Sequence, residues 1–231
     1  PLIIDQDSNL ALAAKRVCLG KFINCGQTCI APDYLFVHKK VKTQFLELLK
    51  QNIQTFFGKE ASKSDNYGRM VNQKQYQRLQ ALLTQGEILF GGEYDEAKKY
   101  ISPTLIKPHS FTSSLMQDEI FGPILPVLEF EDIENVIEFI NQRPRPLALY
   151  YFGTKNAKLL KRTTSGGACI NDAIMHIIPH KLPFGGIGQS GMGAYHGRKS
   201  FDTFSHYKSV LKTNKNFEFT IKYPPYTSLK Q

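Results

Sequence analysis

Apolar side chains recur at three- and four-residue intervals in three stretches of the first 85 residues. The first stretch follows Ser8, which can cap a helix, and stops at Gly26; the second stops at Gly58, and the third spans 72–85. This spacing predicts helices with one apolar face, because residues three and four apart lie on the same side of a helix. The apolar residues of the first helix are therefore expected in the core, namely Leu10, Ala14, Val17, Cys18 and Phe22.

Short apolar runs between these helices are typical of buried strands. Strands are predicted at 34–37, 87–90, 124–130 and 147–152, and further helices at 131–141 and 155–163. Stretches rich in glycine, proline and charge are predicted as surface loops, at 58–68, 91–99 and 143–146. The alternation of strands and helices predicts an α/β fold, with a mostly parallel sheet and flanking helices.

One cysteine falls in a connection between two of these elements. Cys29 follows the end of the first helix at Gly26 and precedes the strand that begins at Tyr34. Such junctions commonly hold catalytic groups, and backbone N–H groups in a turn can stabilise an oxyanion after attack on a carbonyl. A thiol becomes a strong nucleophile when it ionises. Buried structural cysteine remains the competing interpretation on position alone.

Cys29 also lies in the first of several segments that follow one another in an informative order. The segments are Gly26-Gln27-Thr28-Cys29-Ile30-Ala31-Pro32-Asp33-Tyr34, Glu119-Ile120-Phe121-Gly122-Pro123, Pro146-Leu147-Ala148-Leu149-Tyr150, Leu182-Pro183-Phe184-Gly185-Gly186 and Tyr195-His196-Gly197-Arg198-Lys199. Together they resemble the aldehyde dehydrogenase superfamily, and the Ala-Pro-Asp-Tyr ending of the first resembles its class 3 branch. The resemblance covers nearly the whole chain.

The resemblance implies a role for five residues. Cys29 would be the nucleophile, and Glu119 and Phe121 would contact the ribose and nicotinamide of NAD or NADP. Ile174 and Ile177 would line an apolar substrate passage that favours medium-chain or aromatic aldehydes. The implied product is a carboxylic acid, formed through a cysteine thiohemiacetal and a thioester.

The resemblance also implies that this chain is the C-terminal part of a longer protein. The family motif Glu-Leu-Gly-Gly-Lys, which supplies the general base, stands just ahead of the stretch that resembles residues 1–5. We therefore expect a thiol-bearing catalytic domain at 1–182, a glycine-rich segment at 183–204 that returns to an absent dinucleotide-binding domain, and an oligomerisation strand with a C-terminal tail at 205–231. Alone, this part should lack full activity. The strand at 205–212 implies a homodimer.

Charge, cysteine content and hydropathy argue against nucleic acid, metal and membrane as partners. The net charge is +9, and residues 181–231 carry eight Lys or Arg against two acids, yet these cations form no nucleic-acid-binding motif. Four irregularly spaced cysteines make neither a disulfide framework nor a zinc site. No apolar run is long enough to span a bilayer, and no signal segment or lipidation motif is visible. A reduced, cytoplasmic setting without nucleic acid, metal or membrane anchor is expected.

Two motifs are expected to be coincidental. The stretch 186–191 satisfies the Gly-x-Gly-x-x-Gly pattern but follows no clear strand, so it is interpreted as a turn for close packing. His176 and His180 have helical metal-ligand spacing, but Pro179 lies between them and no third ligand is evident.

Two other function classes stay open at this point. A cysteine hydrolase or acyltransferase would need a histidine such as His38 or His196 oriented on Cys29. A dimerising or regulatory module without catalysis would need only the interface strand.

Overall fold

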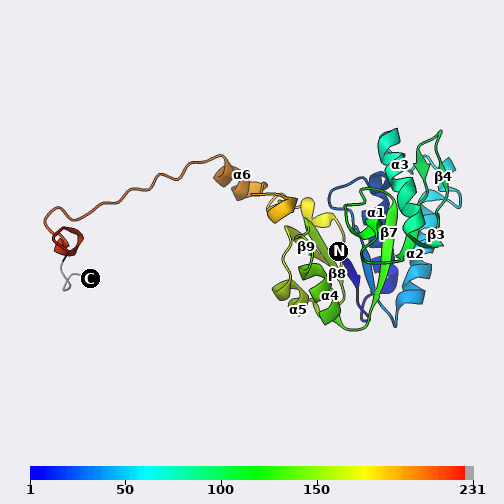
Figure 1. The fold of residues 1–231 in the computed structure, drawn as a ribbon, viewed down its shortest axis with the longest axis horizontal. Helices are drawn as coiled ribbons and strands as arrows, with labels where there is room; N and C mark the ends of the chain where they lie inside the picture. Colours follow the sequence, from blue (N-terminus) through cyan, green and yellow to red (C-terminus); the bar gives the residue numbers. More distant parts are fainter. Residues whose placement is uncertain (227–231) are drawn as a thin grey trace.

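The computed structural model describes residues 1–226 and is built around one seven-stranded sheet (Figure 1). The strand order is β3-β6-β7-β2-β1-β8-β9, and every neighbouring pair is parallel except β3 and β6. The predicted mostly parallel sheet is therefore confirmed. The strands of this sheet are β1 Leu2–Ile4, β2 Leu35–His38, β3 Gly86–Phe90, β6 Thr104–Pro108, β7 Ile124–Phe130, β8 Ala148–Phe152 and β9 Gly167–Ile170.

Helices cover both faces of the sheet. Side chains of α1, α2 and α3 share one apolar cluster, and those of α4 and α5 share the other. Alternation along a strand divides the two clusters: in β1, Leu2 and Ile4 face the first and Ile3 the second. The helices are α1 Leu10–Phe22, α2 Lys42–Phe57, α3 Gln73–Leu82, α4 Ile133–Asn141, α5 Asn156–Arg162 and α6 Gly197–Thr203.

The predicted cap of the first helix is wrong by one residue. Asn9 is the N-cap of α1, and its side chain accepts a hydrogen bond from the Leu12 backbone N–H at 3.2 Å. The Ser8 hydroxyl instead donates to the carbonyl oxygens of Asp5 and Phe152, each at 2.7 Å. Ser8 therefore ties the end of β1 to the end of β8, a long-range contact that local sequence cannot indicate.

Several short elements were not predicted. Strand β1 has only three residues, and polar or small residues interrupt the apolar runs of β6 and β9. The loop expected at 91–99 contains part of a small hairpin, β4 Tyr94–Asp95 with β5 Tyr100–Ile101. The hairpin lies beside α3 and buries both residues of β5.

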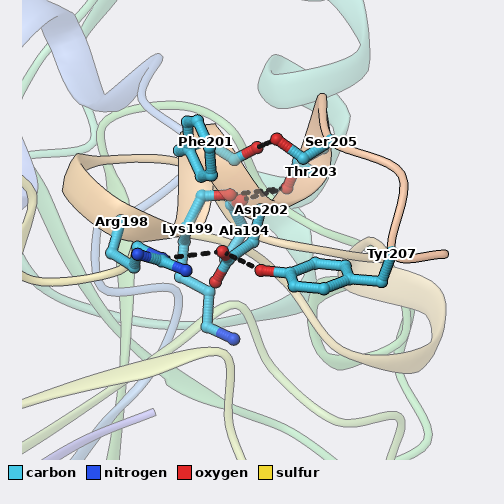
Figure 2. A network of polar contacts seen from close by, with 8 residues as sticks. All are labelled: Ala194, Arg198, Lys199, Phe201, Asp202, Thr203, Ser205 and Tyr207. Atoms are coloured by element: carbon cyan, nitrogen blue, oxygen red, sulfur yellow. Dashed lines mark hydrogen bonds and ion pairs between the residues drawn. The ribbon is translucent and has the colours of Figure 1, made fainter. Parts of the chain in front are cut away.

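The chain leaves the sheet after β9 and runs outward through α6 into an extended C-terminal stretch (Figure 1). Figure 2 shows the network that holds the start of this stretch: Asp202 accepts hydrogen bonds from the Arg198 Nε at 2.8 Å and from the Tyr207 hydroxyl at 2.5 Å. Residues 205–212, where the interface strand is expected, form no strand in this chain. The oligomerisation strand thus stays a prediction, and 227–231 of that predicted segment lie outside the described residues.

Within residues 1–226, no helix is both long and apolar enough to cross a bilayer. The same part of the chain brings no three His, Cys, Asp or Glu side chains together in a way that would hold a metal ion.

Candidate active site

Cys29 lies in the loop between α1 and β2, at the edge of the sheet where the parallel strands begin. Its side chain is exposed, whereas Cys18, Cys25 and Cys169 are buried, and all four thiols are free. Within the described part of the chain, the Cys29 backbone N–H donates no hydrogen bond. The loop therefore offers an accessible sulfur together with an uncommitted donor, the pair of groups that covalent catalysis at a carbonyl requires.

A left-handed turn precedes this loop. Asn24, Cys25 and Gly26 have φ angles of 50°, 57° and 72°. Asparagine and glycine are the residues that adopt this conformation most readily, and cysteine does so rarely. The turn directs the Cys25 side chain into the core, where burial raises the pKa of its thiol to about 11 despite a hydrogen bond with Tyr67.

The loop is fixed from three directions. Gln27 bonds through its side-chain amide to the backbone of 69–71, with the Nε2 donating to the Arg69 carbonyl at 3.1 Å and the Oε1 accepting from the Val71 N–H at 3.0 Å. The hydroxyl of Tyr150, on β8, donates to the Ile30 carbonyl at 2.6 Å. The third contact, from Asp33 at the end of the loop, joins it to the segment that holds Glu119.

The segment 119–123 lies against the Cys29 loop, as the proposed roles of Glu119 and Phe121 require. The Asp33 carboxylate accepts from the Ile120 N–H at 2.9 Å. From α3, the Arg78 guanidinium donates to the backbone carbonyls of Glu119, at 3.4 Å, and of Ile120, at 2.5 Å. Two charged side chains from different elements therefore set the position of this backbone.

Two glycines let these backbones approach. A Cβ on Gly26 would stand 2.2 Å from the carbonyl oxygen of Gly122, and a Cβ on Gly122 would stand 2.4 Å from a methyl carbon of Leu79 on α3. No real Cβ tolerates such distances. The contact therefore joins α3, segment 119–123 and the turn before Cys29 in one packed stack.

The side chains of Glu119 and Phe121 are compatible with the ribose and nicotinamide of a dinucleotide. Glu119 and the Phe121 ring are both exposed, and Phe121 has a φ of 48°. The pKa of Glu119 is raised above its ordinary value, mainly by partial desolvation and also by the charge of Asp33. The charges of Lys21 and Arg78 oppose this shift. An exposed carboxylate can accept hydrogen bonds from the two hydroxyl groups of a ribose, and the adjacent exposed ring can border a nicotinamide. These residues therefore fit the group that the resemblance implies.

A buried lysine lies beneath both segments. The Lys21 side chain, in the last turn of α1, is 1% exposed, and burial lowers its pKa to about 8, opposed by Asp33, Glu119 and Cys25. The nearby carboxylates of Asp33 and Glu119 favour the charged form of this lysine and oppose the effect of burial on its pKa.

A second buried group supports the loop from the β8 side. The His176 ring packs 5.9 Å from the Tyr150 ring and 5.7 Å from the Phe184 ring, and its Nδ1 lies 3.3 Å from the Cys169 sulfur. Its Nε2 is buried and, among the described residues, has no hydrogen-bond partner. Desolvation lowers the pKa of His176, so the ring stays neutral near pH 7.

The two predicted passage residues, Ile174 and Ile177, lie on either side of His176 in the sequence. Ile174 is buried in the first apolar cluster, with a φ of 58° and its side chain against Gly20 of α1, and Ile177 is half-buried and packs on the same cluster. Their place in a substrate passage stays a prediction. An isoleucine with positive φ is unusual, because its branched Cβ crowds the backbone.

The motifs expected to be coincidental have other roles. A Cβ on Gly186 would stand 2.0 Å from the Ser190 carbonyl oxygen, and 188–190 form a single 3₁₀ turn instead of the helix of a nucleotide-binding unit. Close packing at this turn is confirmed. His180 is exposed, and its ring lies 5.4 Å from that of His196.

Comparisons with known proteins agree with this geometry. The model of the aldehyde dehydrogenase family matches residues 1–210. Aldehyde dehydrogenase family 3 member A2 of Mus musculus is 45% identical over 100% of this chain and 49% of its own length. The dimeric, NADP-preferring aldehyde dehydrogenase of Rattus norvegicus is also 45% identical, over 97% of this chain and 51% of its own length.

Solved structures are similar over the same region. The substrate bound state of Staphylococcus aureus AldH matches with a TM-score of 0.87 and 46% identity, covering 98% of this chain and 50% of that one. The chain thus spans about half the length of the relatives it matches. The resemblance to the family and to its class 3 branch is confirmed.

The Gly26–Gly122 contact makes a prediction about stability. Gly26→Ala is expected to lower the free energy of unfolding by at least about 3 kcal/mol, because the new methyl group meets a carbonyl oxygen. Gly58→Ala is the matched control: Gly58 has a similar φ of 78° but nothing within 4 Å of its Cβ position. It should cost only the conformational term of roughly 1 kcal/mol. Urea unfolding compares the two, and equal losses would contradict the close contact.

The buried imidazole makes a prediction about pH. Because the pKa of His176 is lowered in the folded protein, the unfolded chain binds a proton first as the pH falls below about 6.5. Stability should therefore decrease from pH 7 to pH 5.5, and less steeply in His176→Phe, which keeps a ring without a titrating group. Urea unfolding at a series of pH values measures both slopes. Parallel slopes would show that His176 titrates as freely in the fold as outside it.

Proposed function

This chain belongs to the aldehyde dehydrogenase family, and on that premise we propose that it carries the nucleophile of an enzyme that oxidises an aldehyde to a carboxylic acid. The observation that carries the proposal is the position of Cys29. It is the exposed thiol of the four, in a loop packed against the segment of Glu119 and Phe121.

The chemistry of this chain's own residues begins at the sulfur. The Cys29 thiolate attacks the aldehyde carbon, and the uncommitted Cys29 N–H donates to the oxyanion that forms. NAD or NADP, when bound, would supply the hydride acceptor for the thiohemiacetal carbon, and the Cys29 sulfur would then hold the acyl group as a thioester. Water releases the carboxylic acid with the help of a general base, which the family carries in the part that precedes the stretch resembling residues 1–5.

Glu119 and Phe121 are proposed to hold the cofactor. Glu119 would accept hydrogen bonds from the ribose hydroxyls, and Phe121 would limit where the nicotinamide rests. Asp33 and Arg78 would act through the backbone that they bind. The proposed cofactor is NAD or NADP, and the rat relative is described as NADP-preferring.

Substrate, assembly and location complete the proposal. Ile174 and Ile177 support a passage for medium-chain or aromatic aldehydes. A homodimer is supported by the exposed side chains of the outer stretch, of which Phe204 is 91% and Leu211 89% exposed, and the rat relative is described as dimeric. Four free cysteines support a reducing compartment such as the cytoplasm.

A cysteine hydrolase finds less support. His38 ends β2, at the edge of the sheet opposite Cys29, and its Nδ1 accepts from the Lys40 N–H at 3.2 Å. The His196 Nδ1 lies 3.2 Å from the Leu182 carbonyl oxygen. Among the described residues, no imidazole bonds to the Cys29 sulfur, so a general base of the hydrolase kind is not in position.

The proposal predicts the effect of removing the nucleophile. In the longer protein that contains this chain, Cys29→Ala should lower aldehyde-dependent NAD(P)H formation by at least about a thousandfold, since no other group can form the thioester. Cofactor binding, followed by fluorescence titration, should survive. Cys18→Ala, which alters a buried thiol on α1, is the control and should retain turnover. Turnover that persists in Cys29→Ala would eliminate Cys29 as the nucleophile.

A further inference from the structure

We infer that Gln27 is a positioning residue for Cys29: its side-chain amide holds the left-handed turn at 24–26 closed and thereby fixes the loop that presents the thiol. The inference rests on the proposed function of Cys29. Gln27 itself contacts no reacting atom in this arrangement, because both polar atoms of its amide are engaged by backbone groups.

The turn needs support from outside. Three consecutive residues with positive φ are unfavourable for an L-amino-acid chain, and they persist only where neighbouring contacts impose the conformation. Asn24 and Gln27 bond to each other across the turn: the Gln27 Nε2 donates to the Asn24 carbonyl at 3.1 Å, and the Asn24 Nδ2 donates to the Gln27 carbonyl at 3.0 Å. The Gln27 N–H adds a third bond to the Asn24 carbonyl, at 3.1 Å.

The same amide anchors the turn to a separate part of the fold. The carbonyl of Arg69 and the N–H of Val71 face Gln27 as one acceptor and one donor, two residues apart, the arrangement that a neighbouring strand would present. A glutamine side chain matches both groups at once, because its amide carries a donor and an acceptor. Arg69 is itself held, since its guanidinium donates to the carbonyls of Tyr67 and Gly68 at 2.9 Å and 3.1 Å.

Closure of the turn and burial of Cys25 are one event. The Cys25 side chain is 0% exposed and packs against Gly68, whose Cβ position is 3.4 Å from the Cys25 Cβ. If the Gln27 bonds are lost, the turn can relax toward ordinary backbone angles and turn Cys25 toward solvent. The exposure of Cys25 therefore reports the state of the turn without requiring turnover.

Cys29 follows the anchor by two residues. Its loop is held at one end by Gln27 and at the other by the bond from the Tyr150 hydroxyl to the Ile30 carbonyl. Releasing one end leaves the sulfur and the Cys29 N–H less well placed relative to the segment of Glu119. Misplacement on the scale of an ångström is enough to slow a positioned reaction about a hundredfold.

The test uses the longer protein with Gln27→Glu and Gln27→Met. Glutamate has the same shape but, when ionised, points oxygens at the carbonyls of Arg69 and Asn24, and methionine removes both polar atoms. Gln51→Glu, at an exposed position of α2, is the matched control for the added charge. Iodoacetamide labelling of each cysteine is followed by peptide mass spectrometry, and the single-turnover burst of NAD(P)H by stopped flow.

In both Gln27 variants we expect Cys25 labelling to accelerate at least tenfold while Cys18 and Cys169 stay protected. The burst rate should fall about 30-fold or more with the cofactor KM within about threefold of the wild type, since position and not cofactor binding is lost. Gln51→Glu should change neither. Protected Cys25, or an unchanged burst despite exposed Cys25, would overturn the inference. The labelling result stands apart from Cys29→Ala, so a failure of the proposed function is recognised separately.

Discussion

The contact between Gly26 and the carbonyl of Gly122 is the constraint on which the candidate site depends. It brings two segments 96 positions apart in sequence to a distance that no side chain would permit. Packing then continues through Gly122 to Leu79, so that α3 becomes the common support of both segments. Polar groups at the rim, from Asp33 and Arg78, orient what the glycines bring together.

Local patterns predicted most of the fold. Helices α2, α3 and α4 agree with the expected ranges to within a few residues, because their apolar periodicity is long enough to be unambiguous. Strands β2, β7 and β8 also agree, because each is a mostly apolar run next to turn or loop residues. Strands β1, β6 and β9 were missed, because β1 is only three residues long and polar or small residues interrupt the apolar runs of β6 and β9. Their strand character comes from neighbours such as β8, which sequence alone does not position.

The site was predictable only in part, and for a related reason. Cys29, Glu119 and Phe121 stand in segments whose order along the chain identifies the family. Arg78 is one cation among 29, and only the path of α3 turns it toward segment 119–123. Gln27 stood inside a recognised segment, yet its partners at 69–71 lie more than 40 positions away and belong to no motif.

The extended stretch beyond α6 has a thermodynamic consequence. Within the described residues, none of the backbone N–H groups of 206–213 donates a hydrogen bond to another part of this chain. Each of these groups must be satisfied by water or by a surface outside the described chain. Hydrogen exchange of these amides therefore reports whether the stretch is covered. In a lone chain they exchange with deuterated solvent at the rate of a free peptide, and exchange slows when another surface takes the place of water.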